Sequence, residues 1–196
     1  MPHRPATADR RRVLVPLGQG LLGLPLGGVR AQGSGGTCPA LLNHTLPRLQ
    51  DEKPQSLCQH AGKVLLVVNT ASYCGYTGQF EGLEKLNAGY ASRGLVVLGF
   101  PSNDFRQEDA DAKKTAAVCF STYGVKFPMF MPVGVRGPQA HPMFAQLAQA
   151  TGKAPEWNFN KYLVDRQGRA VAHFGSSVEP GSRTLLAAIE QVLAGG

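Results

Sequence analysis

The sequence predicts an α/β fold in which helices flank a central mixed β-sheet. Between residues 63 and 192, continuous apolar, β-branched runs alternate with segments whose apolar residues recur at helical spacing. With 196 residues, 43% of them hydrophobic, the chain can form one domain with a substantial core but is short for two. We therefore expect a single domain over residues 32–196, with the sheet covered by helices.

Individual elements follow from local patterns. Residues 63–69, KVLLVVN, form a continuous apolar run that is typical of a strand buried on both faces. Residues 77–90 place Phe80, Leu83 and Leu86 at helical spacing, which predicts an amphipathic helix. The other expected elements are a strand at 95–100, a less regular helix at 110–123, strands at 129–135, 161–164 and 170–174, and a helix from Pro180 through Val192.

Residues 1–31 have the layout of a secretory signal peptide. The arginine run at 10–12 precedes an uncharged Leu- and Gly-rich stretch at 13–29, and Val29-Arg30-Ala31 fits a cleavage site after Ala31. The stretch contains prolines and many glycines, so it is a poor candidate for a membrane-spanning helix of about 20 apolar residues. We expect export to the periplasm or the medium. A loose twin-arginine pattern at 10–14 leaves that route open, and a disordered tail is the alternative.

Net charge gives little sign of nucleic-acid binding. The formal charge of the whole chain is +7, but residues 1–31 contain five arginines and one acidic residue. The remaining chain has 15 basic and 12 acidic residues, a surplus of only three. No basic stripe for nucleic acid is therefore indicated.

Four cysteines, Cys38, Cys58, Cys74 and Cys119, lie in the expected mature chain. An even number of cysteines in an oxidising compartment favours disulfide formation. Cys38 and Cys58 flank a segment ahead of the first core strand, where a bridge would stabilise by roughly 3 kcal/mol. We expect this structural disulfide, although four cysteines allow three complete pairings. We expect no metal site, because the sequence has no CxxC pair or close His/Cys cluster.

Cys74 lies where the expected strand at 63–69 turns into the expected helix at 77–90. Unpaired N–H groups and the helix dipole at such a position favour the thiolate form. A thiolate can attack an electrophilic sulfur or a peroxide oxygen, and the second reaction produces a sulfenic acid. Position alone also allows a buried cysteine that acts as a small hydrophobic residue.

The chain contains three distinctive segments in order: NTASYCGYTGQFEGLEKL, LGFPSNDFRQE and WNFNKYLV. Together these segments resemble the glutathione peroxidase family in its cysteine-containing, bacterial-type form, and the resemblance extends over residues 38–193. It implies a thioredoxin-like fold and a thiol-dependent peroxidase that reduces hydrogen peroxide and organic or lipid hydroperoxides in response to oxidative stress. It implies no cofactor. The short stretch at 141–157 is similar to that of the monomeric members, so we expect a monomer.

The resemblance also implies a catalytic tetrad. Cys74 matches the family's nucleophile, Gln107 its glutamine, and Trp157 and Asn158 its tryptophan and asparagine. The last three side chains carry N–H donors that can stabilise a thiolate and a developing alkoxide. Without the resemblance, the tryptophan would be interpreted as core and the glutamine as a solvated surface residue.

The sequence departs from the family pattern at two places near these residues. Gly78 replaces a common proline, and the second motif is about one residue shorter before Gln107 than in the animal enzymes. Asp104 is therefore an alternative polar residue for the site. We prefer Gln107, because like-charge repulsion from a carboxylate would oppose ionisation of the thiol.

Cys119 has two interpretations. In thioredoxin-dependent relatives a second cysteine in this region resolves the sulfenic acid, but Cys119 lies about one residue before that position. One residue rotates a helical side chain by about 100°, which favours a buried structural role. If Cys119 does not resolve, an external thiol must act, either a thioredoxin-like protein or glutathione. No arginine cluster that would hold glutathione's carboxylates is evident.

Two other functions remain open from the sequence. One is a thiol-disulfide oxidoreductase or redox sensor, although Cys74 lacks a CxxC partner. The other is a catalytically silent binding module on the same fold.

Overall fold

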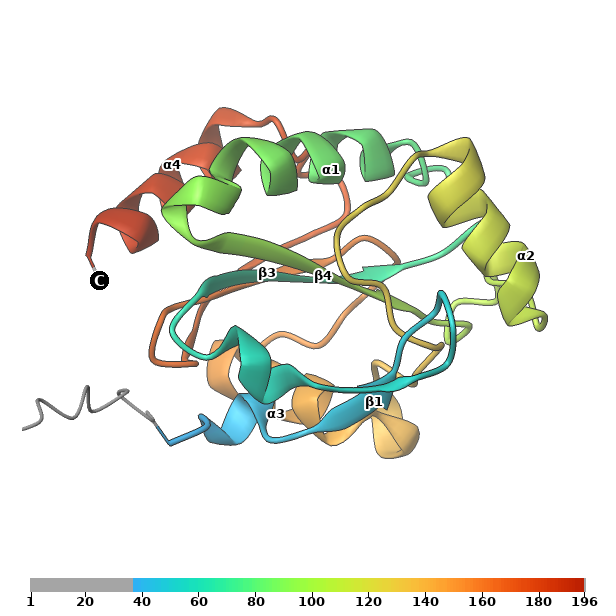
Figure 1. Ribbon diagram of the computed structural model, residues 1–196, viewed down its shortest axis with the longest axis horizontal. Helices are drawn as coiled ribbons and strands as arrows, with labels where there is room; N and C mark the ends of the chain where they lie inside the picture. Colours follow the sequence, from blue (N-terminus) through green and yellow to red (C-terminus); the bar gives the residue numbers. More distant parts are fainter. Residues whose placement is uncertain (1–36, 196) are drawn as a thin grey trace, which may run out of the picture. The chain divides into compact units, whose positions relative to one another are not determined.

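A mixed four-stranded sheet forms the centre of the fold in the computed structural model, which describes residues 37–195. The signal peptide expected at 1–31 lies outside the described residues. Strands β3 and β4 are parallel, β5 is antiparallel to β3, and β6 is antiparallel to β5. In the order β4-β3-β5-β6, the strands span Leu95–Pro101, Val64–Thr70, Lys161–Val164 and Ala170–Phe174. Strands β3 and β4 lie in the middle layer of Figure 1.

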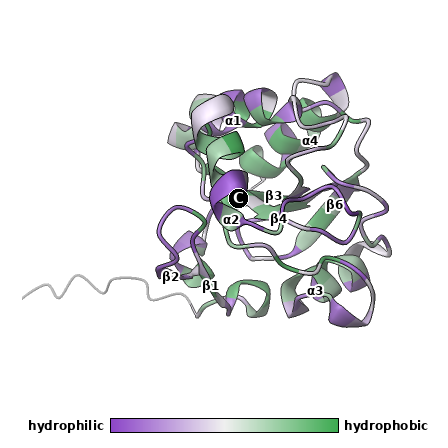
Figure 2. Ribbon diagram, turned by 90° about the vertical axis from the view of Figure 1, so that its right-hand side faces the viewer, coloured by the Kyte–Doolittle hydropathy of each residue, from purple (hydrophilic) through white to green (hydrophobic). Residues whose placement is uncertain are grey.

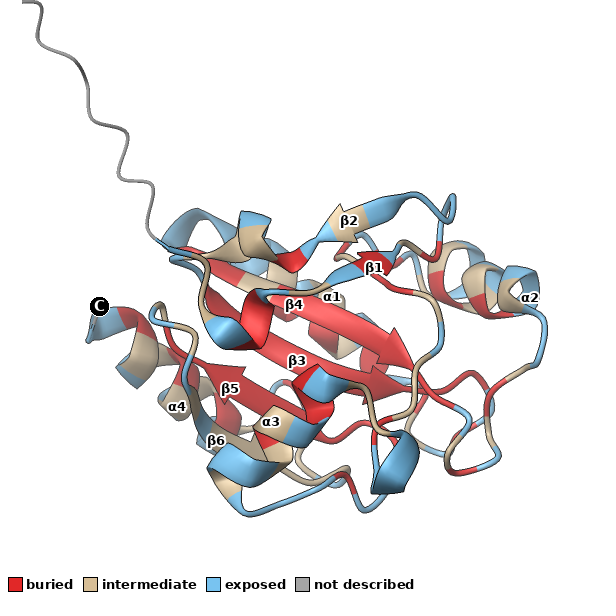
Figure 3. Cartoon of the chain, turned by 90° about the horizontal axis from the view of Figure 1, so that it is seen from below, coloured by how far each residue is buried: buried red, intermediate tan, exposed pale blue. Residues whose placement is uncertain are grey.

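The central strand β3 is buried along its whole length, as the apolar run predicted. Its alternating side chains enter two separate cores, because successive residues of a strand point to opposite faces of the sheet. Leu66 and Val68 belong to one core, and Leu65 and Val67 to the other. The buried strands β3, β4 and β5 therefore form a continuous inner layer (Figure 3).

Helices cover both faces of the sheet. Helices α1 (Gln79–Tyr90) and α4 (Arg183–Ala194) lie on one face, and α3 (Pro142–Thr151) lies on the other (Figure 1). Each turns its apolar residues towards the strands (Figure 2). Short 3₁₀ turns at Ala91–Arg93 (η3) and Gly137–Gln139 (η5) complete the connections. No helix within residues 37–195 is long and apolar enough to cross a bilayer.

An N-terminal hairpin precedes the sheet. Strands β1 (Thr45–Pro47) and β2 (Pro54–Ser56) pair antiparallel, with 3₁₀ turns η1 (Ala40–Leu42) and η2 (Leu57–His60) on either side. A disulfide joins Cys38 to Cys58 across this unit, with the two Cα atoms 5.3 Å apart. The expected pairing is therefore present in the structure.

The sequence-based boundaries were wrong at several places. Residues 129–135 form no strand of the sheet, because Pro128 and Pro132 lack N–H donors; only isolated bridges link Met129 to Gly99 and Phe130 to Arg48. The last helix begins at Arg183 rather than Pro180, where Ser182 accepts a hydrogen bond from the Leu185 N–H.

Three helical regions also differ from expectation. The expected helix at 110–123 is a short α2 (Ala112–Ala116) continued by a π-helical segment, η4 (Ala117–Thr122). Helix α1 begins at Gln79 rather than at residue 77, after a series of turns. Helix α3 was not predicted, although Met143, Phe144 and Leu147 lie at helical spacing and are buried.

Candidate active site

Cys74 lies in a tight turn between the carboxyl end of β3 and the start of α1. Its side chain is 8% exposed, and its Sγ accepts a hydrogen bond from the Tyr76 N–H at 3.4 Å. The Thr77 hydroxyl holds the turn: it accepts from the Cys74 N–H at 3.0 Å and lies within hydrogen-bond distance of the Ala71 and Cys74 carbonyls. The turn thus directs a backbone N–H at the sulfur of Cys74.

Gln107 reaches this turn from the loop after β4. Its carbonyl accepts a hydrogen bond from the Tyr73 N–H at 3.0 Å, next to Cys74 in the chain. Its Oε1 accepts from Asn158 Nδ2 at 3.1 Å, which leaves the Nε2 group to donate to another atom. Arg106 has a positive φ of 57°, a conformation that non-glycine residues seldom adopt and that turns the shortened loop towards the site.

Trp157 and Asn158 come from the segment immediately before β5. Asn158 is completely buried, and its Oδ1 has no hydrogen-bond partner among the described residues. Trp157 is 40% exposed, and its ring centroid lies 5.3 Å from that of Phe105. The three donors predicted beside Cys74 are therefore gathered at the ends of β3, β4 and β5.

Two exposed aromatic residues, Tyr73 and Trp157, belong to the segments that carry the candidate site. Tyr73 is 58% exposed, and its hydroxyl donates to Asp109 Oδ2 at 3.0 Å, which raises the pKa of the Tyr73 phenol. The guanidinium carbon of Arg136 lies 4.5 Å from the centroid of the Phe105 ring, which in turn contacts the ring of Trp157. The guanidinium of Arg136 thus packs on an aromatic pair formed by Phe105 and Trp157.

Asp104, the alternative to Gln107, is used elsewhere. Its Oδ2 accepts hydrogen bonds from the backbone N–H groups of Val135 and Arg136, at 2.6 and 3.1 Å. The carboxylate therefore fixes the connection before α3 rather than facing Cys74.

Cys119 lies in the π-helical segment η4 and is 1% exposed. It belongs to the same apolar core as Cys74, but the two cysteines are not bonded to each other. Burial, together with the charge of Glu108, raises the pKa of its thiol to about 12. Cys119 is consequently a neutral thiol at physiological pH.

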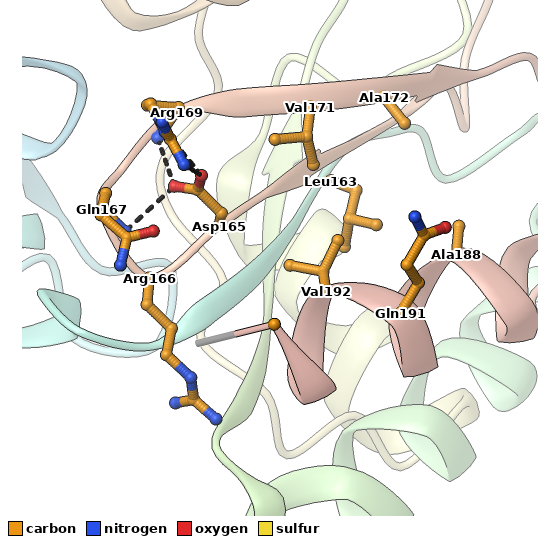
Figure 4. A pocket seen from close by; sticks show the side chains of 11 residues that line it. Leu163, Asp165, Arg166, Gln167, Arg169, Val171, Ala172, Ala188, Gln191 and Val192 are labelled. Atoms are coloured by element: carbon orange, nitrogen blue, oxygen red, sulfur yellow. Dashed lines mark hydrogen bonds and ion pairs between the residues drawn. The ribbon is translucent and has the colours of Figure 1, made fainter.

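Other parts of the described chain offer weaker sites. Residues 37–195 contain no group of three or more His, Cys, Asp or Glu side chains that could hold a metal. A pocket of about 310 Å³ lies between α4 and the turn from β5 to β6 (Figure 4). Asp165 in its wall is paired with Arg169, and the pocket lies at the opposite end of β5 from Asn158, away from Cys74.

Several residues of the site were not found from the sequence. Asn69, Thr77, Asn160 and Ser176 all hydrogen-bond the segments that carry Cys74, Trp157 or Asn158. Thr77 could have been found as a hydroxyl three residues after the cysteine, in the manner of a helix cap. Asn160 binds the Trp157 carbonyl only three residues away, whereas the contacts of Asn69 and Ser176 join distant segments.

The arrangement defines a class of protein: a thiol-based redox protein of α/β architecture, with a cysteine after the central strand and the hydrogen-bonded amides of Gln107 and Asn158 at the same edge of the sheet. The solved structure of a thiol:disulfide interchange protein of the thioredoxin family, from Chlorobium tepidum TLS, superposes with a TM-score of 0.57. It covers 76% of this chain and 92% of its own, at 19% identity, and shows that the fold is thioredoxin-like.

Closer relatives narrow the class. The family model described as glutathione peroxidase matches residues 43–148. The hydroperoxy fatty acid reductase gpx1 of Synechocystis is 44% identical over 154 residues, which cover 73% of this chain and 90% of the relative. The crystal structure of T. cruzi GPX1 superposes with a TM-score of 0.60 at 30% identity, covering 80% of this chain and 97% of that one. This chain belongs to the glutathione peroxidase family and is a thiol-dependent peroxidase.

Proposed function

We propose that Cys74 is the peroxidatic cysteine. The observation that carries the proposal is the turn after β3, which directs the Tyr76 N–H at Sγ while Gln107 and Asn158 meet beside it. The Cys74 thiolate attacks the terminal oxygen of the hydroperoxide and the O–O bond breaks. Cys74 becomes a sulfenic acid, and the departing alkoxide takes up a proton to leave as an alcohol, or as water when the substrate is hydrogen peroxide.

Gln107, Trp157 and Asn158 stabilise the charges in this step. The Nε2 group of Gln107 and the indole N–H of Trp157 donate to the thiolate and then to the developing alkoxide. Asn158 holds the Gln107 amide through the 3.1 Å hydrogen bond. Its unpartnered Oδ1 is a buried acceptor that can accept a hydrogen bond from the O–H group of the incoming hydroperoxide.

An external thiol reduces the sulfenic acid in this proposal. Cys119 is a poor resolving residue, because a buried thiol with a pKa raised to about 12 supplies almost no thiolate at neutral pH. The first external thiol forms a mixed disulfide with Cys74 and releases water. A second thiol then regenerates Cys74 and leaves as the disulfide of the two donors. Glutathione and a thioredoxin-like protein are the two donor classes to compare.

The substrate class that fits the site is a bulky, amphipathic hydroperoxide. The exposed rings of Tyr73 and Trp157 offer apolar surface for an acyl chain beside Cys74. The guanidinium of Arg136, placed over Phe105, can bind a carboxylate at the other end of that surface. The name of the Synechocystis relative, a hydroperoxy fatty acid reductase, supports this choice.

Export to the periplasm or the medium completes the proposal. It is supported by the signal-peptide pattern of residues 1–31 and by the Cys38–Cys58 disulfide, which would persist in an oxidising compartment. We propose that the exported protein acts as a monomer. Fractionation of cells that express the full chain, with size-exclusion chromatography of the mature protein, tests both points.

Trapping of the sulfenic acid tests the assignment of the nucleophile. The mature protein is treated with one equivalent of hydrogen peroxide in the presence of dimedone, and the adduct is located by peptide mass spectrometry. We expect one adduct, on Cys74, in both the wild type and the Cys119→Ser variant. An adduct mainly on Cys119, or none on Cys74, would contradict the assignment.

A further inference from the structure

Three consecutive carbonyl groups of the Trp157–Asn158 segment are each held by a side chain. The Trp157 carbonyl accepts from Asn69 Nδ2 at 3.0 Å and from Asn160 Nδ2 at 2.8 Å. The Asn158 carbonyl accepts from the Ser176 hydroxyl at 2.5 Å. The Phe159 carbonyl accepts from the buried ammonium of Lys161 at 2.7 Å.

This segment needs such support because its backbone is strained. Phe159 has a φ of 61°, in the left-handed region that costs a bulky residue of order 1–3 kcal/mol. The strained residue turns the chain between Asn158, which is in the site, and β5. The side chains of Asn69, Asn160 and Lys161 all come from β3, β5 or the residue adjoining β5, so they hold the segment against the sheet.

Ser176 differs from these residues because it comes from the loop after β6 and contacts both halves of the site. Its hydroxyl donates to the Asn158 carbonyl and accepts from Asn160 Nδ2 at 3.0 Å. Its own carbonyl accepts from Gln79 Nε2 at 2.8 Å, and Gln79 is the first residue of α1, the helix that follows Cys74. A single residue thus connects the Asn158 segment to the start of the nucleophile helix.

We propose that Ser176 is a positioning residue for peroxide reduction, whose hydroxyl fixes Asn158, and through it Gln107, relative to Cys74. The inference rests on the proposed role of Cys74. Ser176 does not touch the reacting atoms, so its effect passes through Asn158. Loss of the hydroxyl leaves a buried carbonyl without its donor and releases the segment from the α1 side of the site. Displacements of about 1 Å in a catalytic group can lower rates up to about 100-fold.

The test compares Ser176→Ala with Ser177→Ala, the matched change at the exposed neighbouring serine. The second-order rate constant for oxidation of Cys74 by hydrogen peroxide is measured by stopped flow. We expect Ser176→Ala to lower it about tenfold, Ser177→Ala to leave it within about twofold, and Ser176→Thr, which restores a hydroxyl, to recover most of the loss.

A double-mutant cycle separates positioning from a general loss of stability. In an Asn158→Ala background, the Ser176→Ala change should alter the rate constant by less than about twofold, because the Asn158 side chain, through which it acts on Gln107, is absent. Trp157 is the only tryptophan in the chain, so its fluorescence reports directly on this segment. We expect acrylamide quenching of Trp157 to increase in Ser176→Ala and to stay unchanged in Ser177→Ala.

Two results would overturn the proposal. One is a Ser176→Ala protein with wild-type rate constant and wild-type Trp157 quenching. The other is an equal loss of rate from Ser176→Ala in the presence and absence of the Asn158 side chain. Failure of the proposed function looks different, since the wild-type protein itself would then oxidise no faster than a free cysteine.

Discussion

Removing the Cys38–Cys58 disulfide should destabilise the domain without altering its chemistry. The bridge spans a sequence separation of 20 residues, for which the loop-entropy model gives about 3.3 kcal/mol at 25 °C. In a domain of this size each kcal/mol lowers the melting temperature by about 2–4 °C, so we expect a decrease of about 7–13 °C. The Cys38→Ser/Cys58→Ser double variant is the suitable perturbation, because a single substitution would leave a reactive free thiol.

Differential scanning calorimetry of the double variant and the wild type measures the change. The rate constant for Cys74 oxidation should stay within about twofold, because the bridged unit packs on the core that contains Leu42 and Leu57, whereas Cys74 belongs to the core on the opposite face of the sheet. A loss of less than about 1 kcal/mol would refute the entropic argument. A large loss of rate at a temperature where the variant is folded would refute the separation of the bridge from the site.

Three further substitutions test the site. Asn158→Ala should lower the rate constant for Cys74 oxidation by about 100-fold in stopped-flow measurements, because the Gln107 amide loses the hydrogen bond that holds it. A decrease of less than about threefold would exclude a role for Asn158 in holding Gln107. Arg136→Gln should reduce kcat/KM for a free hydroperoxy fatty acid about two- to fivefold while leaving the methyl ester and hydrogen peroxide unaffected, and an equal loss with the ester would rule out carboxylate binding. Folding raises the pKa of the Cys119 thiol from 9.0 to about 12, so the stability due to its neutral form is present below pH 9 and is lost as the pH rises towards 12. Between pH 8 and pH 10 the free energy of unfolding in urea should therefore decrease by about 1.4 kcal/mol more in the wild type than in Cys119→Ala. Parallel pH profiles of the two free energies would contradict the burial argument.

The sequence predicted the parts of the fold that rest on local, regular patterns. The apolar run before Cys74 forms the central strand, and residues 161–164 and 170–174 form strands with the expected bounds. Residues 129–135 have the composition of a strand, but the prolines at 128 and 132 remove N–H groups that a ladder would need. Strand pairing there is limited to two isolated bridges, one with Gly99 of β4 and one with Arg48.

The candidate site likewise contains residues that the sequence predicted and residues that only the structure revealed. Cys74, Trp157 and Asn158 lie in segments whose residue pattern is distinctive, and the structure places them at adjoining strand ends. The position of Gln107 depends on the positive φ of Arg106. The residue types of this loop do not indicate that backbone conformation. Ser176 lies 18 residues from Asn158 and 97 from Gln79 along the chain, in a loop without periodicity, so only the folded structure brings these residues together.

The most direct test of the central claim is the rate at which Cys74 reacts with a hydroperoxide. Reduced mature protein is mixed in a stopped-flow instrument with hydrogen peroxide or a fatty acid hydroperoxide, and formation of the sulfenic acid is followed. We predict oxidation several orders of magnitude faster than that of a free cysteine, retained in Cys119→Ser and abolished in Cys74→Ser. Oxidation at the rate of free cysteine, unchanged by Cys74→Ser, would contradict the assignment of Cys74 as the peroxidatic residue.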